Sequence, residues 1–108
     1  MVVLSAMGKT TDQLVSLANR CTKNPDMRDY DLLVSSGEQV SISLLSMSIK
    51  DLGRDSVAYT GWQAGIRTNN SHSSASIVDI NAKKIKKLLM LYDKISFYLM
   101  TLIVKKGL

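Results

Sequence analysis

The chain has 108 residues, of which 45% are hydrophobic and 21% charged, the proportions of an ordinary globular protein with a single core. The formal net charge is +5, but residues 1–80 hold seven Lys/Arg against eight Asp/Glu, and residues 81–108 hold seven Lys against one Asp. The single cysteine excludes an internal disulfide framework and a cysteine-based zinc site, and favours a reduced, cytoplasmic setting. The apolar start, Val2 to Leu4, is too short for a signal peptide.

The first predicted element is a buried strand at Val2–Leu4, where the residues are apolar and mostly β-branched. A helix follows, with Thr11 or Asp12 as its N-cap, and Asn24-Pro25-Asp26 ends it. The apolar residues at helical spacing are Leu14, Leu17, Ala18 and Cys21. On that face Cys21 is expected to be a buried, inert thiol.

The stretch "SSGEQVSISLLSMSIKDLG", residues 35–53, predicts a second, amphipathic helix. Ser35 with Glu38, or Ser36 with Gln39, has the spacing of a capping box at the start of this helix. Gly53 is placed to end it as a C-cap glycine.

The remaining elements alternate between short strands and one helix. They are a strand at 56–60, a glycine-bracketed turn at 61–65, a polar loop at 68–76, a strand at 77–80, a lysine-rich helix at about 82–92 and a buried strand at 95–104. The order of elements favours an α/β fold with a mainly parallel sheet. The apolar run at 95–104 is too short to span a membrane. The lysines at 83–87 fit a solvated helix face better than a nucleic-acid surface.

The segment "SAMGKTTDQL" contains Gly-Lys-Thr after an apolar run, as a nucleotide-binding P-loop does. A P-loop needs a glycine five positions before Gly8, and Val3 occupies that position inside the predicted strand. A weaker anion site near Gly8–Thr11 stays open, because a turn that leads into a helix leaves free N–H donors.

Three further residues have a structural and a functional interpretation. Glu38 either completes a capping box with Ser35 or holds the ammonium group of a small substrate, and the residues alone leave both open. His72 has no partner residue at a catalytic spacing and is interpreted as a surface histidine. Trp62 is interpreted as a packing residue beside a turn.

Three blocks, "VVLSAMGKTTDQLVSLA", "LLVSSGEQVSISLLSMSI" and "YTGWQAGI", resemble bacterial aspartokinases of the amino-acid kinase family in order and spacing. The resemblance runs from about Val2 to Asp79, with a weaker match in "AKKIKKLL". It implies a partial three-layer αβα sandwich with a mainly parallel sheet. It also implies ATP- and Mg-dependent phosphorylation of the side-chain carboxylate of L-aspartate, the entry to lysine, methionine and threonine synthesis.

The resemblance also implies roles for individual residues. Ser5 and Thr11 of the SAMG-x-TT loop lie at the amino-acid site in that family, and Glu38 of the Ser-Gly-Glu block binds the amino group of the substrate. These roles agree with the residue chemistry, since hydroxyl groups suit a carboxylate and a carboxylate suits an ammonium.

The sequence also departs from the family pattern. A Lys-Phe-Gly-Gly-Thr-Ser motif, the later glycine-rich nucleotide block and the regulatory domains are not found in it, and residues 72–76 read His-Ser-Ser-Ala-Ser in place of His-Gly-Asn-Ala-Arg. We therefore expect a partial catalytic domain at 1–94 and a divergent apolar and basic tail at 95–108. The isolated chain is expected to be inactive, and to self-associate or to assemble with the remainder of a kinase. The alternative is a non-catalytic binding or oligomerisation module that assembles with a separate partner chain.

Overall fold

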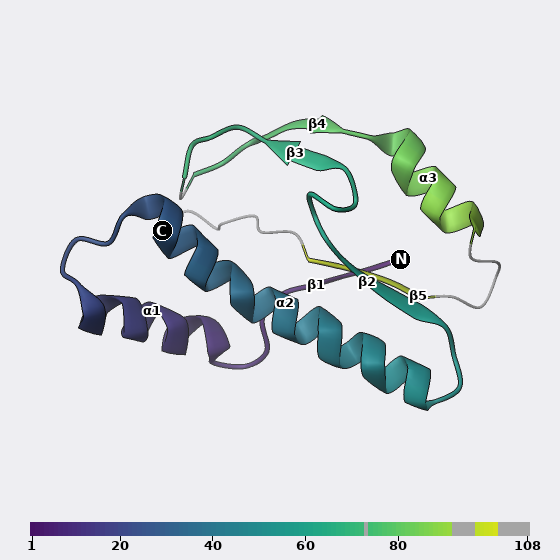
Figure 1. Cartoon of the computed structure of the whole chain (residues 1–108), viewed down its shortest axis with the longest axis horizontal. Coiled ribbons are helices and arrows are strands. Elements are labelled where there is room, and N and C mark those ends of the chain that lie inside the picture. Colours follow the sequence, from purple (N-terminus) through teal and green to yellow (C-terminus); the bar gives the residue numbers. More distant parts are fainter. Residues whose placement is uncertain (73, 92–96, 102–108) are drawn as a thin grey trace.

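A computed structural model describes the backbone of residues 1–72, 74–91 and 97–101 (Figure 1). Its elements are, in order, β1 (Val2–Leu4), α1 (Thr10–Cys21), α2 (Met27–Asp51), β2 (Ser56–Thr60), β3 (Ile66–Thr68), β4 (Ile77–Ile80), α3 (Ala82–Leu91) and β5 (Phe97–Thr101). The predicted mixture of helices and strands is confirmed. The predicted strand 95–104 contains β5, and its other residues lie outside the described part of the chain.

The strands form two sheets. In the first, β5 lies between β1 and β2 and pairs in parallel with both, so that Leu99 is opposite Val2 on one side and Ala58 on the other. In the second, β3 and β4 pair antiparallel, with a register shift between Arg67 and Thr68. The sheet therefore places β5, the last described strand, between β1, which precedes α1 in the sequence, and β2, which follows α2.

β1 is an edge strand of the first sheet, and the prediction that it is buried is wrong. Val2 is 38% and Val3 50% exposed. The reason is that β1 has a hydrogen-bonding neighbour on one side only among the described residues, and none of its three residues is enclosed on both faces. Apolar composition predicted the strand correctly but not its surroundings.

α1 begins at Thr10, two or three residues earlier than an N-cap at Thr11 or Asp12 predicts. Its N-cap is Lys9, and no side chain makes a capping hydrogen bond, so neither Thr11 nor Asp12 is the cap. The helix ends at Cys21, before Pro25, as predicted. Cys21 is exposed, contrary to expectation, because Ala18 is the one buried residue on this helix.

α2 is one helix of 25 residues, where the sequence predicted a start near residue 35. Its N-cap is Asp26, whose carboxylate accepts hydrogen bonds from the amides of Arg28 and Asp29. The hydroxyl of Ser35 donates instead to the carbonyl of Leu32, so the predicted capping box is wrong at Ser35. The hydroxyls of Ser36 and Ser35 both bond within the helix interior, an arrangement that local sequence cannot distinguish from a cap.

Gly53 ends α2 as predicted. It follows the C-cap residue Leu52 and has a φ of +76°, a backbone conformation that favours glycine. Its amide donates to the carbonyl of Lys50 at 2.9 Å, and the amide of Arg54 donates to that of Ile49 at 3.2 Å.

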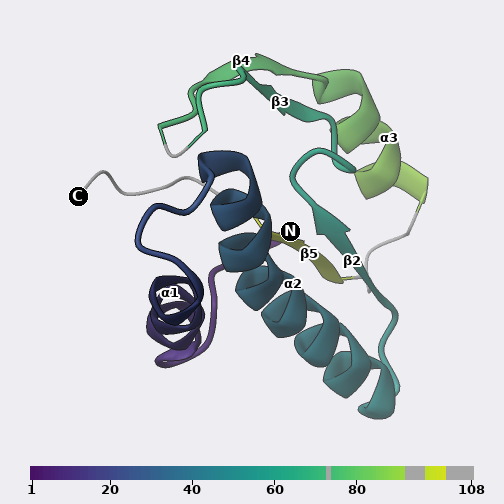
Figure 2. The ribbon, with the colours of Figure 1, turned by 60° about the vertical axis from the view of Figure 1, so that its left-hand side comes forward.

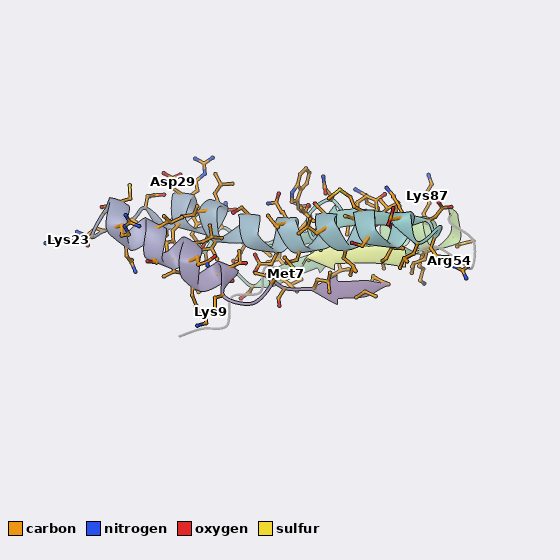
Figure 3. The ribbon with its side chains drawn as sticks, turned by 90° about the horizontal axis from the view of Figure 1, so that it is seen from below. Met7, Lys9, Lys23, Asp29, Arg54 and Lys87 are labelled. Carbon is orange, nitrogen blue, oxygen red and sulfur yellow. The ribbon has the colours of Figure 1, made fainter. Side chains whose placement is uncertain are left out.

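α2 lies along one face of the parallel sheet, and α1 packs beside its N-terminal half (Figures 2 and 3). The buried residues of α2 are small or medium-sized: Ser35, Gly37, Ser41, Ile42 and Ser46. By length and composition alone α2 is apolar enough to cross a membrane, but in this structure its small buried residues pack against a sheet and a helix. α2 therefore belongs to the helical layer that covers this face of the sheet.

The hairpin of β3 and β4 arches away from the first sheet and leads into α3 (Figure 1). β3 was not predicted, because three residues between a turn and a polar loop carry too little periodicity. The side chain of Asn81 accepts a hydrogen bond from the amide of Lys84 and so caps the start of α3. The predicted last residue of this helix, Tyr92, lies outside the described residues.

Candidate functional site at the carboxyl edge of the parallel sheet

The loop Ser5–Lys9 joins the carboxyl end of β1 to the start of α1. Gly8 has a φ of +49°, and the amide of Thr10 donates to the carbonyl of Met7 at 3.0 Å, which closes a tight turn. Loops at the carboxyl ends of parallel strands are the usual ligand-binding positions in α/β sheets. The predicted motif is therefore at the edge of the sheet where a site is expected.

The N-terminus of α1 carries unused hydrogen-bond donors. The amide of Gln13 bonds to the carbonyl of Lys9, whereas no acceptor for the amides of Thr11 and Asp12 is found in the described residues. The hydroxyls of Ser5 and Thr11 likewise have no hydrogen-bond partner there. Together with the positive end of the helix dipole, these groups suit a carboxylate or another small anion.

Glu38 lies in the interior of α2, and one of its carboxylate oxygens is anomalous. Oε2 is buried and has no hydrogen-bond partner among the described residues. A buried carboxylate oxygen without a partner costs free energy, so natural proteins rarely retain one without a purpose. The arrangement suits an ammonium group that would supply the missing donors.

Gly37, the chain neighbour of Glu38, is a point of close contact between α2, the loop and α1. A Cβ atom at Gly37 would lie 3.3 Å from Ala6 Cβ and 3.3 Å from Thr10 Cγ2. Ala6 and Thr10 are the chain neighbours of Ser5 and Thr11, so α2 contacts the loop and α1 one residue away from each of the three predicted site residues. Sequence reasoning missed Gly37 as part of this region, although a glycine inside a predicted helix was a signal of close approach.

Comparison with known proteins finds relatives that match most of this chain. Aspartokinase 2 of Bacillus subtilis (strain 168) is 57% identical over 81 residues, which are 75% of this chain and 20% of the relative. The aspartokinase of Geobacillus stearothermophilus is 51% identical over 89 residues, covering 82% of this chain and 22% of the relative. This chain is homologous to a segment of the aspartokinases.

A solved structure agrees with this homology. The crystal structure of aspartate kinase from Synechocystis matches 99% of this chain and 17% of its own chain, with a TM-score of 0.69 and 32% sequence identity. The chain spans about a fifth of the length of the aspartokinases that it matches. No protein-family model matches it.

The turn after β2 lies at the same edge of the sheet as the loop Ser5–Lys9, because β1 and β2 are both parallel to β5. In this turn, Gly61–Gly65, the amide of Thr60 donates to Gln63 Oε1 at 2.9 Å, and the Thr60 hydroxyl accepts from the Gln63 amide at 3.4 Å. Trp62 is 75% exposed, so the prediction that it is a packing residue is wrong. The paired Thr60 and Gln63 side chains hold the turn and leave the indole outside.

The described residues do not include a P-loop. Val3 lies in β1, as the argument against a P-loop required, and Lys9 is exposed and points away from α2 (Figure 3). No group of three or more His, Cys, Asp or Glu side chains that could hold a metal ion is found within the described part of the chain. His72 is on the surface as predicted, where its Nδ1 lies 3.6 Å from Asp31 Oδ2.

Proposed function

We propose that this chain supplies the aspartate-binding part of an aspartokinase, an enzyme that uses ATP to phosphorylate the side-chain carboxylate of L-aspartate on the way to lysine, methionine and threonine. The observation that carries the proposal is the buried Glu38 Oε2 without a partner among the described residues, on a helix that contacts the loop with unused donors through the neighbouring Gly37. An amino acid offers an ammonium and a carboxylate close together, and this region presents one complementary group for each.

The roles of the three residues follow from their chemistry. Glu38 accepts hydrogen bonds from the ammonium of aspartate. Thr11, with its hydroxyl and free amide at the start of α1, and Ser5, with its hydroxyl at the end of β1, donate to a carboxylate. Each of these bonds involves a charged partner, which makes it stronger than a bond between neutral groups.

The chain alone is proposed to be inactive. Phosphoryl transfer to a carboxylate joins two anions and therefore depends on positioning and on neutralising charge. ATP and Mg²⁺ are the family's nucleotide and metal, and the three proposed residues act on aspartate alone, so no catalytic step is assigned to this chain.

The wider architecture is proposed in the same way. Residues 1–94 would be a partial catalytic domain, and residues 95–108 a tail whose sequence diverges but whose strand β5 occupies the middle of the sheet. The helices α1 and α2 would be one outer layer of a three-layer αβα sandwich, whose other face is completed by the rest of a kinase. We place the protein in the cytoplasm.

Aspartate binding tests the proposal. Titration of the 108-residue chain with L-aspartate, followed by calorimetry, is expected to show binding that Glu38→Gln weakens by about tenfold or more, since a charge-assisted hydrogen bond is lost. Gln39→Ala, an exposed neighbour on the same helix, is the matched control and should bind normally. Equal binding by Glu38→Gln and the unmodified chain would exclude the assigned role.

Activity is tested separately by coupling ADP release to a spectroscopic readout in the presence of ATP, Mg²⁺ and L-aspartate. The chain alone should remain at background, with or without aspartate. Turnover by the chain alone that Glu38→Ala abolishes would overturn the proposed inactivity while supporting the site.

A second candidate is a non-catalytic module that assembles with another chain or with copies of itself. It is favoured by exposed apolar side chains on α2, where Val40, Leu44 and Met47 recur at helical spacing and are 47%, 43% and 58% exposed. Sedimentation velocity distinguishes it: association that Leu44→Lys abolishes, without aspartate binding, would favour the module over the kinase.

A further inference from the structure

The backbone conformation at Gly37 does not require a glycine. It lies in the interior of α2 and is absent from the glycines with positive φ, which are Gly8, Gly53 and Gly65. Alanine in place of glycine within a helix ordinarily stabilises it by about 1 kcal/mol. Helix propensity therefore disfavours glycine at position 37, so the reason for the glycine has to lie in the packing around it.

The packing around Gly37 leaves no room for a methyl group. A Cβ atom there would lie 3.2 Å from Leu14 Cδ1, 3.3 Å from Ala6 Cβ and 3.3 Å from Thr10 Cγ2. These contacts are tighter than ordinary van der Waals distances, so the neighbours would have to move by a few tenths of an ångström. All three belong to the loop after β1 or to the first turns of α1.

This contact controls one distance that matters for the proposed site. Gly37 is directly bonded to Glu38, whereas Ala6 and Thr10 adjoin Ser5 and Thr11. A wedge at Gly37 would separate the acceptor for an ammonium from the donors for a carboxylate. A binding constellation has to be held to within about 0.5 Å, and a shift of a few tenths of an ångström takes up much of that tolerance, so we expect it to weaken recognition.

We propose that Gly37 is a positioning residue that sets the spacing between Glu38 and the loop, and thereby selects ligands with an ammonium next to a carboxylate. The inference rests on the proposed function, since it assigns a specificity device to the same site. The absence of a side chain at Gly37 is what allows α2 to approach α1 closely enough.

The test compares L-aspartate with succinate, which has the same two carboxylates and lacks the ammonium. Calorimetric titration of the 108-residue chain should show a preference for aspartate. Gly37→Ala is expected to reduce this preference by about tenfold, because the ammonium contact is the one that is stretched. A purely structural effect would weaken the binding of both ligands equally and leave the preference unchanged.

Two further variants test whether the contact at Gly37 is the cause of the effect. Thr10→Ser removes Cγ2 but keeps the hydroxyl, so the double variant Thr10→Ser/Gly37→Ala should recover part of the lost preference. Ala6→Val adds bulk from the loop side of the same contact and should reproduce the effect of Gly37→Ala. It also serves as the informative variant if Gly37→Ala does not fold, as judged by circular dichroism. Gln39→Ala is the control.

The possible results separate the two claims. An unmodified chain that binds succinate as well as aspartate overturns the proposed function and this inference with it. An unmodified chain that prefers aspartate, combined with unchanged preference in Gly37→Ala and Ala6→Val, overturns the positioning role alone. Failure of Thr10→Ser to restore any preference would also contradict it.

Discussion

The hydroxyls of Ser46 and Ser56 lie 2.8 Å apart in the interior, and Ser56 Oγ also donates to the Ser46 carbonyl at 2.7 Å. Ser46 belongs to α2. Ser56 is the first residue of β2, and it is only 1% exposed. This pair joins the helix to the sheet through buried polar groups that satisfy each other.

Ser56→Ala should lower the free energy of unfolding by about 1–3 kcal/mol, because it leaves a buried Ser46 hydroxyl and carbonyl with one partner fewer. Urea denaturation followed by circular dichroism measures the change. Ser48→Ala is the control, since the exposed Ser48 hydroxyl donates to the Leu44 carbonyl in its own helix, and its effect should stay within about 0.5 kcal/mol. Similar losses in the two variants would contradict the importance of the buried pair.

Asp26→Ala should lower the free energy of unfolding by about 1 kcal/mol, since Asp26 caps two amides at the start of α2. Asp26→Asn should retain most of the stability, because asparagine is an equally good N-cap. The same denaturation experiment checks both variants. An asparagine variant as unstable as the alanine variant would indicate that charge, rather than capping, matters at this position.

Gly53→Ala should destabilise the protein by about 1–2 kcal/mol through the backbone alone, since φ is +76° and a Cβ atom there would meet nothing within 4 Å. Gly53→Asn should cost less, because asparagine adopts the left-handed conformation more easily. Thermal unfolding of the two variants measures the difference. Equal transition temperatures for glycine and alanine at this position would contradict the assigned role.

Glu38→Gln should leave the free energy of unfolding unchanged or raise it by about 1 kcal/mol, while it weakens aspartate binding. The reason is that the variant removes a buried charged oxygen that has no internal partner. Asp51→Asn, at the exposed end of the same helix, controls for the change in net charge. A clear loss of stability in Glu38→Gln alone would mean that the carboxylate has a structural partner.

Local signals predicted several boundaries correctly. Pro25 ends the helical run before it, Gly53 ends α2, and the alternation at 56–60 becomes β2. Each of these depends on the backbone chemistry of a few residues, which tertiary packing does not change. Where a signal had two structural meanings, as at Ser35, the local interpretation was wrong, because Asp26 provides a better cap nine residues earlier.

Exposure was the property that sequence predicted least well. Cys21 and Trp62 were expected to be packed and are exposed, and β1 was expected to be buried and lies at an edge. Burial of an apolar side chain is favourable, but whether a surface is available to bury it depends on the neighbouring elements.

By itself, the sequence determined the resemblance to aspartokinases and the order of most elements, because motif spacing and backbone chemistry are local properties, and it predicted Ser5, Thr11 and Glu38 as candidate site residues. Only the tertiary structure decided that Glu38 lies inside a long helix with a buried oxygen, and that Gly37 of the same helix lies against the loop and α1. These facts depend on contacts between segments about 30 residues apart, such as Ala6 and Gly37, and no periodicity within either segment encodes the distance between them.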